Sequence, residues 1–422
     1  MKTLKGKRLL VISSDSSDIE FVKAAKELDM EVVCCDRYED WNISPAKLIS
    51  DDAWNMDYTD TEAVAKKCRE ENIDGVIAGY GEDRVLAACR VSNAIGTPFY
   101  ATEEQINITR DKRLFKKICN ECGVNTPREY SLGIPMDRED LDKVKYPVIV
   151  KPSDNGGRKG ISVCLNEAQL TKAVKDAADY SKTGEVVVEE YLTGVELSAI
   201  YTISNGEASF SCLNDKYISQ ENENSSLCDF VITPSRFYDE YLRTVDAGIK
   251  KLLKHIGAKN GVANFQLIAA PDGIKAFEMG YRVNGNNDFK VIRKYNDIDF
   301  MKMLITYVTT GDMGDSLSKD NPLFKEYYCT LTLLLKAGKI AKTDYSKLKE
   351  LDNIDDISVW KKPGDTIYNT GTNAQKAGMI KFSAKNMDEV KRTVQFIHEN
   401  LIVEDENGNS MKMKLFDTKR LD

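Results

Sequence analysis

Histidine is nearly missing from this sequence, with 2 residues among 422. Both, His255 and His398, fall near the carboxyl ends of predicted helices, where a cation suits the helix dipole. Two such residues give little support to a Ser–His or Cys–His nucleophile. Any chemistry therefore falls to lysine, arginine, carboxylates and a hard metal ion.

Long apolar runs and an excess of positive charge are also missing. No stretch approaches the length that spans a bilayer, and the formal net charge is −8. This charge disfavours a general nucleic-acid binder or a protein of anionic membrane surfaces. The amino-terminal residues lead into only a short uncharged run, Leu9 to Ser13, which is too short for a signal peptide. We therefore expect a cytoplasmic protein with no nucleic-acid and no membrane partner.

Cysteine is scattered over the chain, so its 10 residues do not suggest a disulfide framework. Cys119 and Cys122 form one isolated CxxC pair inside a predicted helix. No second pair lies at a spacing suited to zinc, so this pair predicts neither a metal site nor a redox site.

The first part of the chain predicts an open α/β unit. Short apolar strands at 8–13, 31–35 and 74–78 alternate with amphipathic helical segments, a pattern typical of a parallel sheet. The first strand-to-helix turn, Ser13 to Ser17, contains no glycine, which argues against a dinucleotide site there. We expect this unit to be a platform for a catalytic domain.

A strand–loop–strand pattern at 146–164 is the most informative segment. Its β-branched residues 148–150 favour a strand that delivers Lys151 at its end. Glycines in the following loop allow main-chain N–H groups to approach an anion closely. The loop contains Gly156, Gly157, Arg158, Lys159 and Gly160. This pattern suits nucleotide phosphates, although a solvated hairpin tip would give a similar sequence.

A predicted amphipathic helix at 109–122 has Leu114 among the residues of its apolar side and Lys112 in its first turn. A cation there is mildly unfavourable for the helix dipole, so Lys112 suggests an anionic partner. An ordinary solvated lysine is the alternative.

A predicted hairpin at 262–287 brings polar residues together. The turn Pro271 to Gly273 suits a three-residue loop that pairs Ala270 with Ile274. Counting outward from that pair places Gln266 opposite Glu278.

Period-two alternation then places a polar row on one face of this hairpin. The row consists of Asn264, Gln266, Glu278, Gly280 and Arg282. Opposed Cβ atoms lie roughly 4.5–5.5 Å apart, so an amide and a carboxylate can share Mg²⁺. An exposed polar sheet face is the alternative.

In this order, the segments resemble the ATP-grasp superfamily, which includes biotin carboxylase, carbamoyl-phosphate synthetase, D-alanine–D-alanine ligase and the L-amino-acid ligases. The resemblance covers nearly the whole chain and implies an α/β fold with an α+β grasp domain. It implies a preATP-grasp domain with an open parallel sheet at 1–105. An ATP-grasp domain with two subdomains clamping ATP would follow at 106–320, and a small α/β domain at 321–422. The second domain would contain a linker helix at 109–122 and a flap subdomain at about 125–192.

The resemblance also implies contacts with ATP. Lys112 looks like the family's helix lysine that contacts phosphates, and Lys151 looks like the strand lysine that holds the α- and β-phosphates. The loop 154–160 looks like the flap above them. Glu196 looks like the ribose contact. The segment that looks like the adenine-binding hinge contains Glu189, Glu190 and Leu192.

The metal row matches the family pattern with one departure. Gln266 and Glu278 look like ligands of Mg²⁺ or Mn²⁺, but Gly280 stands where the family usually has a metal-binding asparagine. Asn264, directly opposite, or the loop 284–288 is expected to supply the missing oxygen. An altered or lost second metal site is the alternative.

The implied reaction converts a small-molecule carboxylate into an acyl phosphate, which an amine attacks, with release of ADP and phosphate. Lys151 and Arg282 are the expected catalytic residues. Arg282 is included because its forked guanidinium suits an acyl phosphate. Expected substrate contacts are Lys216, Arg282, Asn284 and Asn286. A homodimer is common in the family. Two alternatives stay open: a carbamoyl-phosphate-synthetase-like enzyme acting on bicarbonate or carbamate, and an ATP-binding protein without catalysis.

Overall fold

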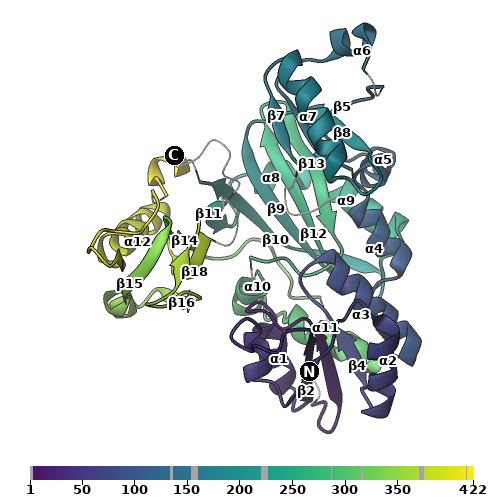
Figure 1. The fold of residues 1–422 in the computed structure, drawn as a ribbon, viewed down its shortest axis with the longest axis vertical. Coiled ribbons are helices and arrows are strands. Elements are labelled where there is room, and N and C mark those ends of the chain that lie inside the picture. The colour runs from purple at the N-terminus through teal and green to yellow at the C-terminus, as the bar shows by residue number, and fades with distance from the viewer. Residues whose placement is uncertain are drawn as a thin grey trace. The chain divides into compact units, whose positions relative to one another are not determined.

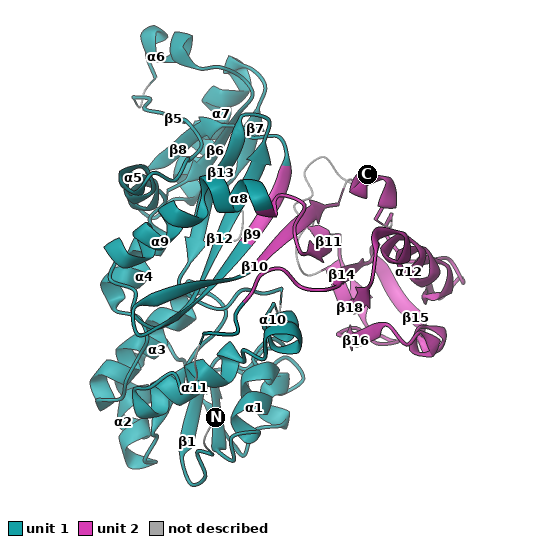
Figure 2. Ribbon diagram, turned by 180° about the vertical axis from the view of Figure 1, so that it is seen from behind, with its two compact units in different colours: residues 1–194, 199–211, 239–320 teal, residues 195–198, 212–238, 321–422 magenta. Residues whose placement is uncertain are grey.

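The computed structural model describes residues 3–133, 136–153, 160–219, 227–286, 288–314, 317–369, 375–414 and 416–422. These residues form two compact units (Figure 2). Unit 1 comprises residues 1–194, 199–211 and 239–320, and unit 2 comprises residues 195–198, 212–238 and 321–422. Within the described residues, no helix has both the length and the apolar content that a membrane-spanning helix requires.

Unit 1 begins with a four-stranded parallel sheet in the order β3-β2-β1-β4. Two of its strands, β2 and β4, are labelled near the amino terminus in Figure 1. Its strands are β1 (Arg8–Ile12), β2 (Glu31–Asp36), β3 (Asp52–Asn55) and β4 (Gly75–Ile77). The helices that follow them are α1 (Ile19–Lys26), α2 (Thr61–Glu70) and α3 (Glu82–Ile95), with a 3-10 turn at Pro45–Leu48. The predicted open parallel sheet is therefore confirmed, with β3 as a strand that the sequence pattern did not suggest.

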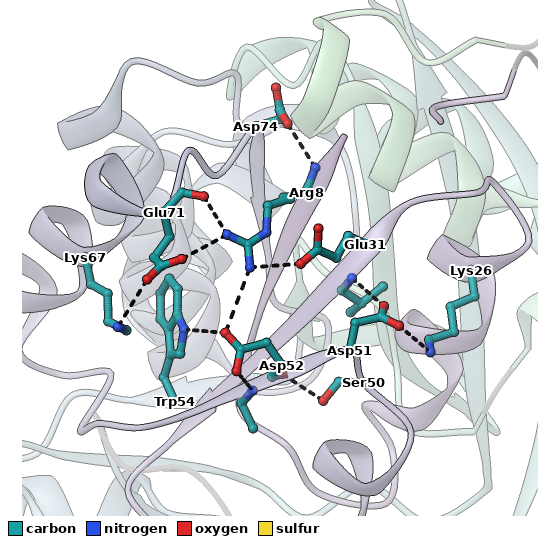
Figure 3. A network of polar contacts seen from close by, with 12 residues as sticks. Arg8, Lys26, Glu31, Ser50, Asp51, Asp52, Trp54, Lys67, Glu71 and Asp74 are labelled. Carbon is teal, nitrogen blue, oxygen red and sulfur yellow. Dashed lines mark hydrogen bonds and ion pairs between the residues drawn. The ribbon is translucent and has the colours of Figure 1, made fainter. Parts of the chain in front are cut away.

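Arg8 ties together the amino ends of these strands (Figure 3). Its Nη2 lies 2.9 Å from Glu31 Oε1, and its Nη1 donates to the main-chain oxygen of Glu71 at 2.7 Å. The Arg8 main-chain N–H donates to Asp74 Oδ2 at 2.9 Å, and Asp52 Oδ2 lies 3.9 Å from Nη2. This network therefore lies at the amino ends of the strands. Open α/β sheets bind ligands at the other edge, outside the carboxyl ends of their strands.

Two helices, rather than one, lead into the next sheet. They are α4 (Glu103–Arg110) and α5 (Lys112–Cys122). The helix expected from Thr109 is interrupted at Asp111, whose extended backbone ends α4 and whose carboxylate caps α5 by accepting the N–H groups of Arg113 and Leu114. This side-chain cap favours a new helix start at Lys112.

A small antiparallel sheet follows, in the order β5-β8-β6-β7. Its strands are β5 (Glu129–Tyr130), β6 (Val148–Pro152), β7 (Ser162–Cys164) and β8 (Val186–Glu190), and its helices are α6 (Arg138–Lys143) and α7 (Glu167–Tyr180). Val148, Val150 and Val188 pack with the apolar side of α7 in one core. Because neighbouring residues of a strand face opposite ways, Lys151 and Glu189 lie on the face away from α7.

The remaining strands form an eight-stranded sheet in the order β13-β12-β9-β10-β11-β14-β18-β16. The strands of this sheet that have all or some of their residues in unit 1 are β9 (Val195–Ser204), β10 (Glu207–Ile218), β12 (Gly261–Ala270) and β13 (Gly273–Gly280). The other helices of unit 1 are α8 (Tyr238–Thr244), α9 (Asp246–His255), α10 (Phe289–Asn296) and α11 (Phe300–Thr310).

Unit 2 has its own apolar core between its strands and α12 (Met387–Asn400). Its strands in the large sheet are β11 (Cys228–Thr233), β14 (Tyr327–Leu334), β16 (Ile354–Val359) and β18 (Lys376–Ala384). A three-stranded sheet contains β15 (Gly338–Asp344), β17 (Thr366–Ile367) and β19 (Ile402–Asp405), and 3-10 turns lie at Ser346–Glu350 and Thr418–Leu421. A parallel sheet combined with a large antiparallel sheet confirms the predicted α/β class.

Candidate active site

The polar strand pair β12–β13 is the centre of the candidate site. Gln266 pairs directly with Glu278, as predicted. Both side chains are partly exposed, and within the described part of the chain neither has a hydrogen bond or an ion pair. An amide oxygen and a carboxylate that are opposed and not otherwise engaged can accept a hard cation.

The predicted turn of this hairpin is wrong by one residue. Ala270 pairs with Gly273, not with Ile274, so the turn contains two residues rather than three. A β-bulge between Gln266 and Leu267 restores the predicted pairing at the site, because Phe277 is inserted opposite this step. The side chain of the inserted Phe277 is partly exposed.

Asn264 and Gly280 are also opposed, as predicted. The Asn264 side chain is 4% exposed, and its Nδ2 donates to the main-chain oxygens of Gly280, at 3.1 Å, and Arg282, at 2.8 Å. A Cβ atom on residue 280 would lie 3.0 Å from Asn264 Nδ2. The small residue at 280 and the amide at 264 therefore fit one another, and Asn264 fastens the end of the hairpin.

Arg282 leaves the hairpin toward α3. Its Nε lies 2.6 Å from Glu82 Oε1, and its Nη1 donates to the main-chain oxygen of Val283 at 2.9 Å. Glu82 begins α3 directly after the carboxyl end of the parallel sheet, so this ion pair joins the metal row to the expected platform. The sequence pattern did not reveal Glu82, because its partner lies 200 residues away.

The polar loop after Arg282 is held by its own residues. Asn284 is buried, and its amide contacts the carboxylate of Asp288, while its Oδ1 accepts the N–H of Asn286 at 3.3 Å. Asn286 is partly exposed. The predicted substrate roles of Asn284 and Asn286 stay predictions.

Lys151 lies at the end of β6, where its ammonium is held near the metal row. Its Nζ lies 2.7 Å from Glu189 Oε2 and 5.7 Å from the ring centroid of Phe277, the neighbour of Glu278. Lys151, one of the two lysines expected to contact phosphates, thus lies next to the strand pair. This proximity joins the two segments that the sequence pattern selected independently.

The hinge residues divide into buried and exposed side chains. Glu189 points inward, with 1% of the residue exposed, and ion-pairs with both Lys151 and Lys116. Burial opposes its ionisation, but the charges of Lys151 and Lys116 lower the pKa of Glu189 below its ordinary value. Glu190 Oε1 accepts the Lys275 ammonium at 2.7 Å, and Leu192 is partly exposed beyond the strand.

The helix lysines of α5 differ in exposure. Lys112 begins the helix and is partly exposed, so its phosphate role stays a prediction. Lys116, one turn later, is buried, whereas Leu114, expected on the apolar side, is exposed. The sequence signal for Lys116 was its place between the apolar Phe115 and Ile118.

Of the predicted flap, only its last glycine can be placed. Gly160 has φ +74°, and a Cβ there would lie 2.8 Å from Tyr180 Cβ and 2.9 Å from Pro152 Cγ. Its lack of a side chain therefore serves close packing. The other six residues of the predicted flap, 154–159, lie outside the described residues, and they include Gly156, Gly157, Arg158 and Lys159.

In unit 2, Glu196 and Lys216 form an ion pair between β9 and β10. Both side chains are largely buried, so each neutralises the other. Their predicted ribose and substrate contacts stay predictions.

The donor set fits one hard divalent cation. Within the described residues, no group of three or more His, Cys, Asp and Glu side chains is placed to hold a metal. The row instead offers one carboxylate, from Glu278, and one amide oxygen, from Gln266. Mg²⁺ is suited to such a set because it keeps several water or phosphate ligands and needs few from protein.

Comparison with known proteins agrees with this architecture. The family model described as "D-ala D-ala ligase C-terminus" matches residues 133–225. The carbamoyl phosphate synthase large chain of Methanobrevibacter smithii is 25% identical over 345 residues, which cover 76% of this chain and 31% of that protein. The chain thus spans about three tenths of the length of the curated relatives it matches.

Two solved structures share the fold along nearly the whole chain. An L-amino acid ligase from Bacillus licheniformis has a TM-score of 0.80 at 17% identity, with 96% of this chain and 100% of that chain covered. A biotin carboxylase domain dimer from Hydrogenobacter thermophilus, solved with MgADP and bicarbonate, has a TM-score of 0.76 at 19% identity, with 94% and 90% covered. With this fold and these relatives, the chain is confirmed as similar to the ATP-grasp superfamily and has its fold.

Proposed function

We propose that this chain is an ATP-dependent carboxylate–amine ligase of the ATP-grasp type. The proximity of Lys151 to the Gln266–Glu278 pair is the observation that supports this function best. Lys151 Nζ lies 5.7 Å from the ring centroid of Phe277, the residue next to Glu278, so the cation is near the strand that carries the carboxylate. A nucleotide triphosphate with Mg²⁺ needs both a cation and hard oxygen donors. The L-amino acid ligase that shares the fold supports the same class of reaction.

In this proposal, Gln266 and Glu278 hold Mg²⁺ or Mn²⁺ with ATP, and Lys151 and Lys112 contact the phosphates. The metal, when bound, withdraws charge from the phosphate oxygens. The substrate carboxylate attacks the γ-phosphate, and the bond between the γ-phosphorus and the bridging oxygen of ADP breaks. The amine then attacks the acyl carbon, and phosphate leaves with the oxygen that the carboxylate supplied.

Arg282 is the residue that we assign to the acyl phosphate. Its Nε is paired with Glu82 and its Nη1 donates to the main-chain oxygen of Val283, and these two contacts fix the plane of the guanidinium beside the metal row. The remaining N–H groups can donate to phosphate oxygens in a forked geometry. Catalysis by positioned charge needs no histidine, in agreement with the composition.

The test is ADP release by the full chain in the presence of MgATP, hydroxylamine and pools of carboxylic acids. A ligase of this type converts one pool into a hydroxamate with stoichiometric ADP. If the chain binds ATP but releases no ADP with any pool of acids, an ATP-binding protein without catalysis would be favoured.

A second acid deserves its own assay because the curated relatives are carbamoyl phosphate synthases. Bicarbonate would give a carboxyphosphate, which decomposes in water. ADP release that depends on bicarbonate and leaves no hydroxamate would identify this alternative.

A further inference from the structure

Lys116 has an unusual place for a lysine. It lies on α5 with 4% of its surface exposed, and its Nζ is 2.6 Å from Glu129 Oε2. The same ammonium contacts Oε1 of Glu189. Lysine is almost never buried unless it is paired, so these two carboxylates account for its position.

Glu189 is shared between two lysines. Lys116 occupies its Oε1, and Lys151 occupies its Oε2 at 2.7 Å. The result is an alternating chain of charges, Glu129–Lys116–Glu189–Lys151, that joins β5, α5, β8 and β6. All four side chains belong to unit 1.

This chain bears on the charge that Lys151 can offer to a phosphate. A buried carboxylate with one lysine partner would hold that lysine strongly and cancel its field. With Lys116 on the other oxygen, Glu189 is already neutralised, and the charge of Lys151 remains available. Lys116 also fixes the carboxylate against which Lys151 is oriented.

We propose that Lys116 is a positioning residue for ATP: as the counter-charge of Glu189, it keeps Lys151 available to the nucleotide phosphates. This inference rests on the proposed function, because it takes ATP as the ligand of Lys151. Lys116 itself does not contact the nucleotide.

The test compares ATP dissociation constants, measured calorimetrically with Mg²⁺, for the full chain and its variants. Lys116→Met is expected to weaken ATP binding about tenfold, which corresponds to about 1.4 kcal/mol. Lys117→Met, an exposed neighbour on the same helix, is the matched control and should bind as wild type. Glu129→Gln removes the outer carboxylate and should leave the affinity equal or up to about threefold tighter, which corresponds to at most about 0.7 kcal/mol.

A double variant separates positioning from simple packing. Lys116→Met with Glu189→Gln removes the uncompensated carboxylate and should bind ATP more tightly than Lys116→Met alone. If Lys116 served only the packing of α5, the second substitution would weaken binding further. That result, or wild-type affinity in Lys116→Met, would overturn the inference.

The proposed function fails in a different way. A wild-type chain that binds no ATP would overturn both the function and the role of Lys116. If Lys116→Met does not fold, the Glu129→Gln variant decides: weaker ATP binding in this variant contradicts the charge chain, because its sign is the reverse of the expected one.

Discussion

The substitution Asn264→Asp distinguishes two roles for Asn264, which are to hold the end of the hairpin by hydrogen bonds or to bind the metal. In the structure, Asn264 Nδ2 donates to the main-chain oxygens of Gly280 and Arg282. An ionised aspartate has the same shape but no donor, so it would lose both hydrogen bonds and bring a negative charge against two carbonyl oxygens. The substitution should therefore destabilise the native state.

The expected magnitude follows from burial. Two lost hydrogen bonds cost about 2 kcal/mol together. The residue at this position is only 4% exposed, so the new carboxylate must either lose its hydration or take up a proton. A rise of about two to three pH units in the pKa of the new carboxyl costs about 3–4 kcal/mol at neutral pH. The total is about 5–6 kcal/mol, large for a single substitution that changes one atom.

Urea denaturation at neutral pH and Mn²⁺ binding by electron paramagnetic resonance test this reasoning together. Asn107→Asp, an exposed position on α4, is the control and should leave both measurements unchanged. If Asn264 only fastens the hairpin, the variant is less stable and binds Mn²⁺ no better than wild type. An unchanged urea midpoint with tighter Mn²⁺ binding would refute this and return Asn264 to the ligand role that the sequence suggested.

Three further predictions concern other parts of unit 1. Glu82→Gln releases the Arg282 guanidinium, so kcat in the hydroxamate assay should fall about tenfold while KM for ATP stays constant; a changed KM alone would argue against a role at the acyl phosphate. Burial raises the pKa of Asp18 to about 8, so the native state keeps a proton that the unfolded state releases above about pH 4, and stability should fall between about pH 4 and 8. Melting temperatures against pH should therefore decline less in Asp18→Asn than in wild type. A methyl group at residue 160 would have to displace Tyr180 or Pro152. Gly160→Ala should therefore reduce the free energy of unfolding by about 2 kcal/mol and lower the melting temperature accordingly.

The polar row shows what alternation can predict. Gln266 and Glu278 were placed opposite one another from the period of a strand, and the structure confirms the pair. The path to this pair was wrong at Ala270, where the turn is one residue shorter, and Phe277 compensates as the inserted residue. A single inserted residue changes the face of everything beyond it, so local pattern fixes such a register only when two errors cancel or none occurs.

Lys116 shows what local pattern misses. The sequence pattern did not single out Lys116 and placed Leu114 on the apolar side of the helix, whereas Lys116 is buried and Leu114 is exposed. Helical spacing gives both residues similar claims to the buried side. The decision came from Glu189, a strand residue distant in the sequence, whose buried carboxylate is stabilised by a cation and not by a leucine.

The most direct test of the ligase mechanism is the fate of a carboxylate oxygen. The acid identified by the hydroxamate screen is labelled with ¹⁸O in its carboxylate and incubated with MgATP, the amine and the full chain. Passage through an acyl phosphate predicts phosphate that carries one ¹⁸O atom, formed in step with ADP. Phosphate without ¹⁸O, released at the same rate as ADP and product, would contradict an acyl phosphate and the roles given to Lys151, Glu278 and Arg282.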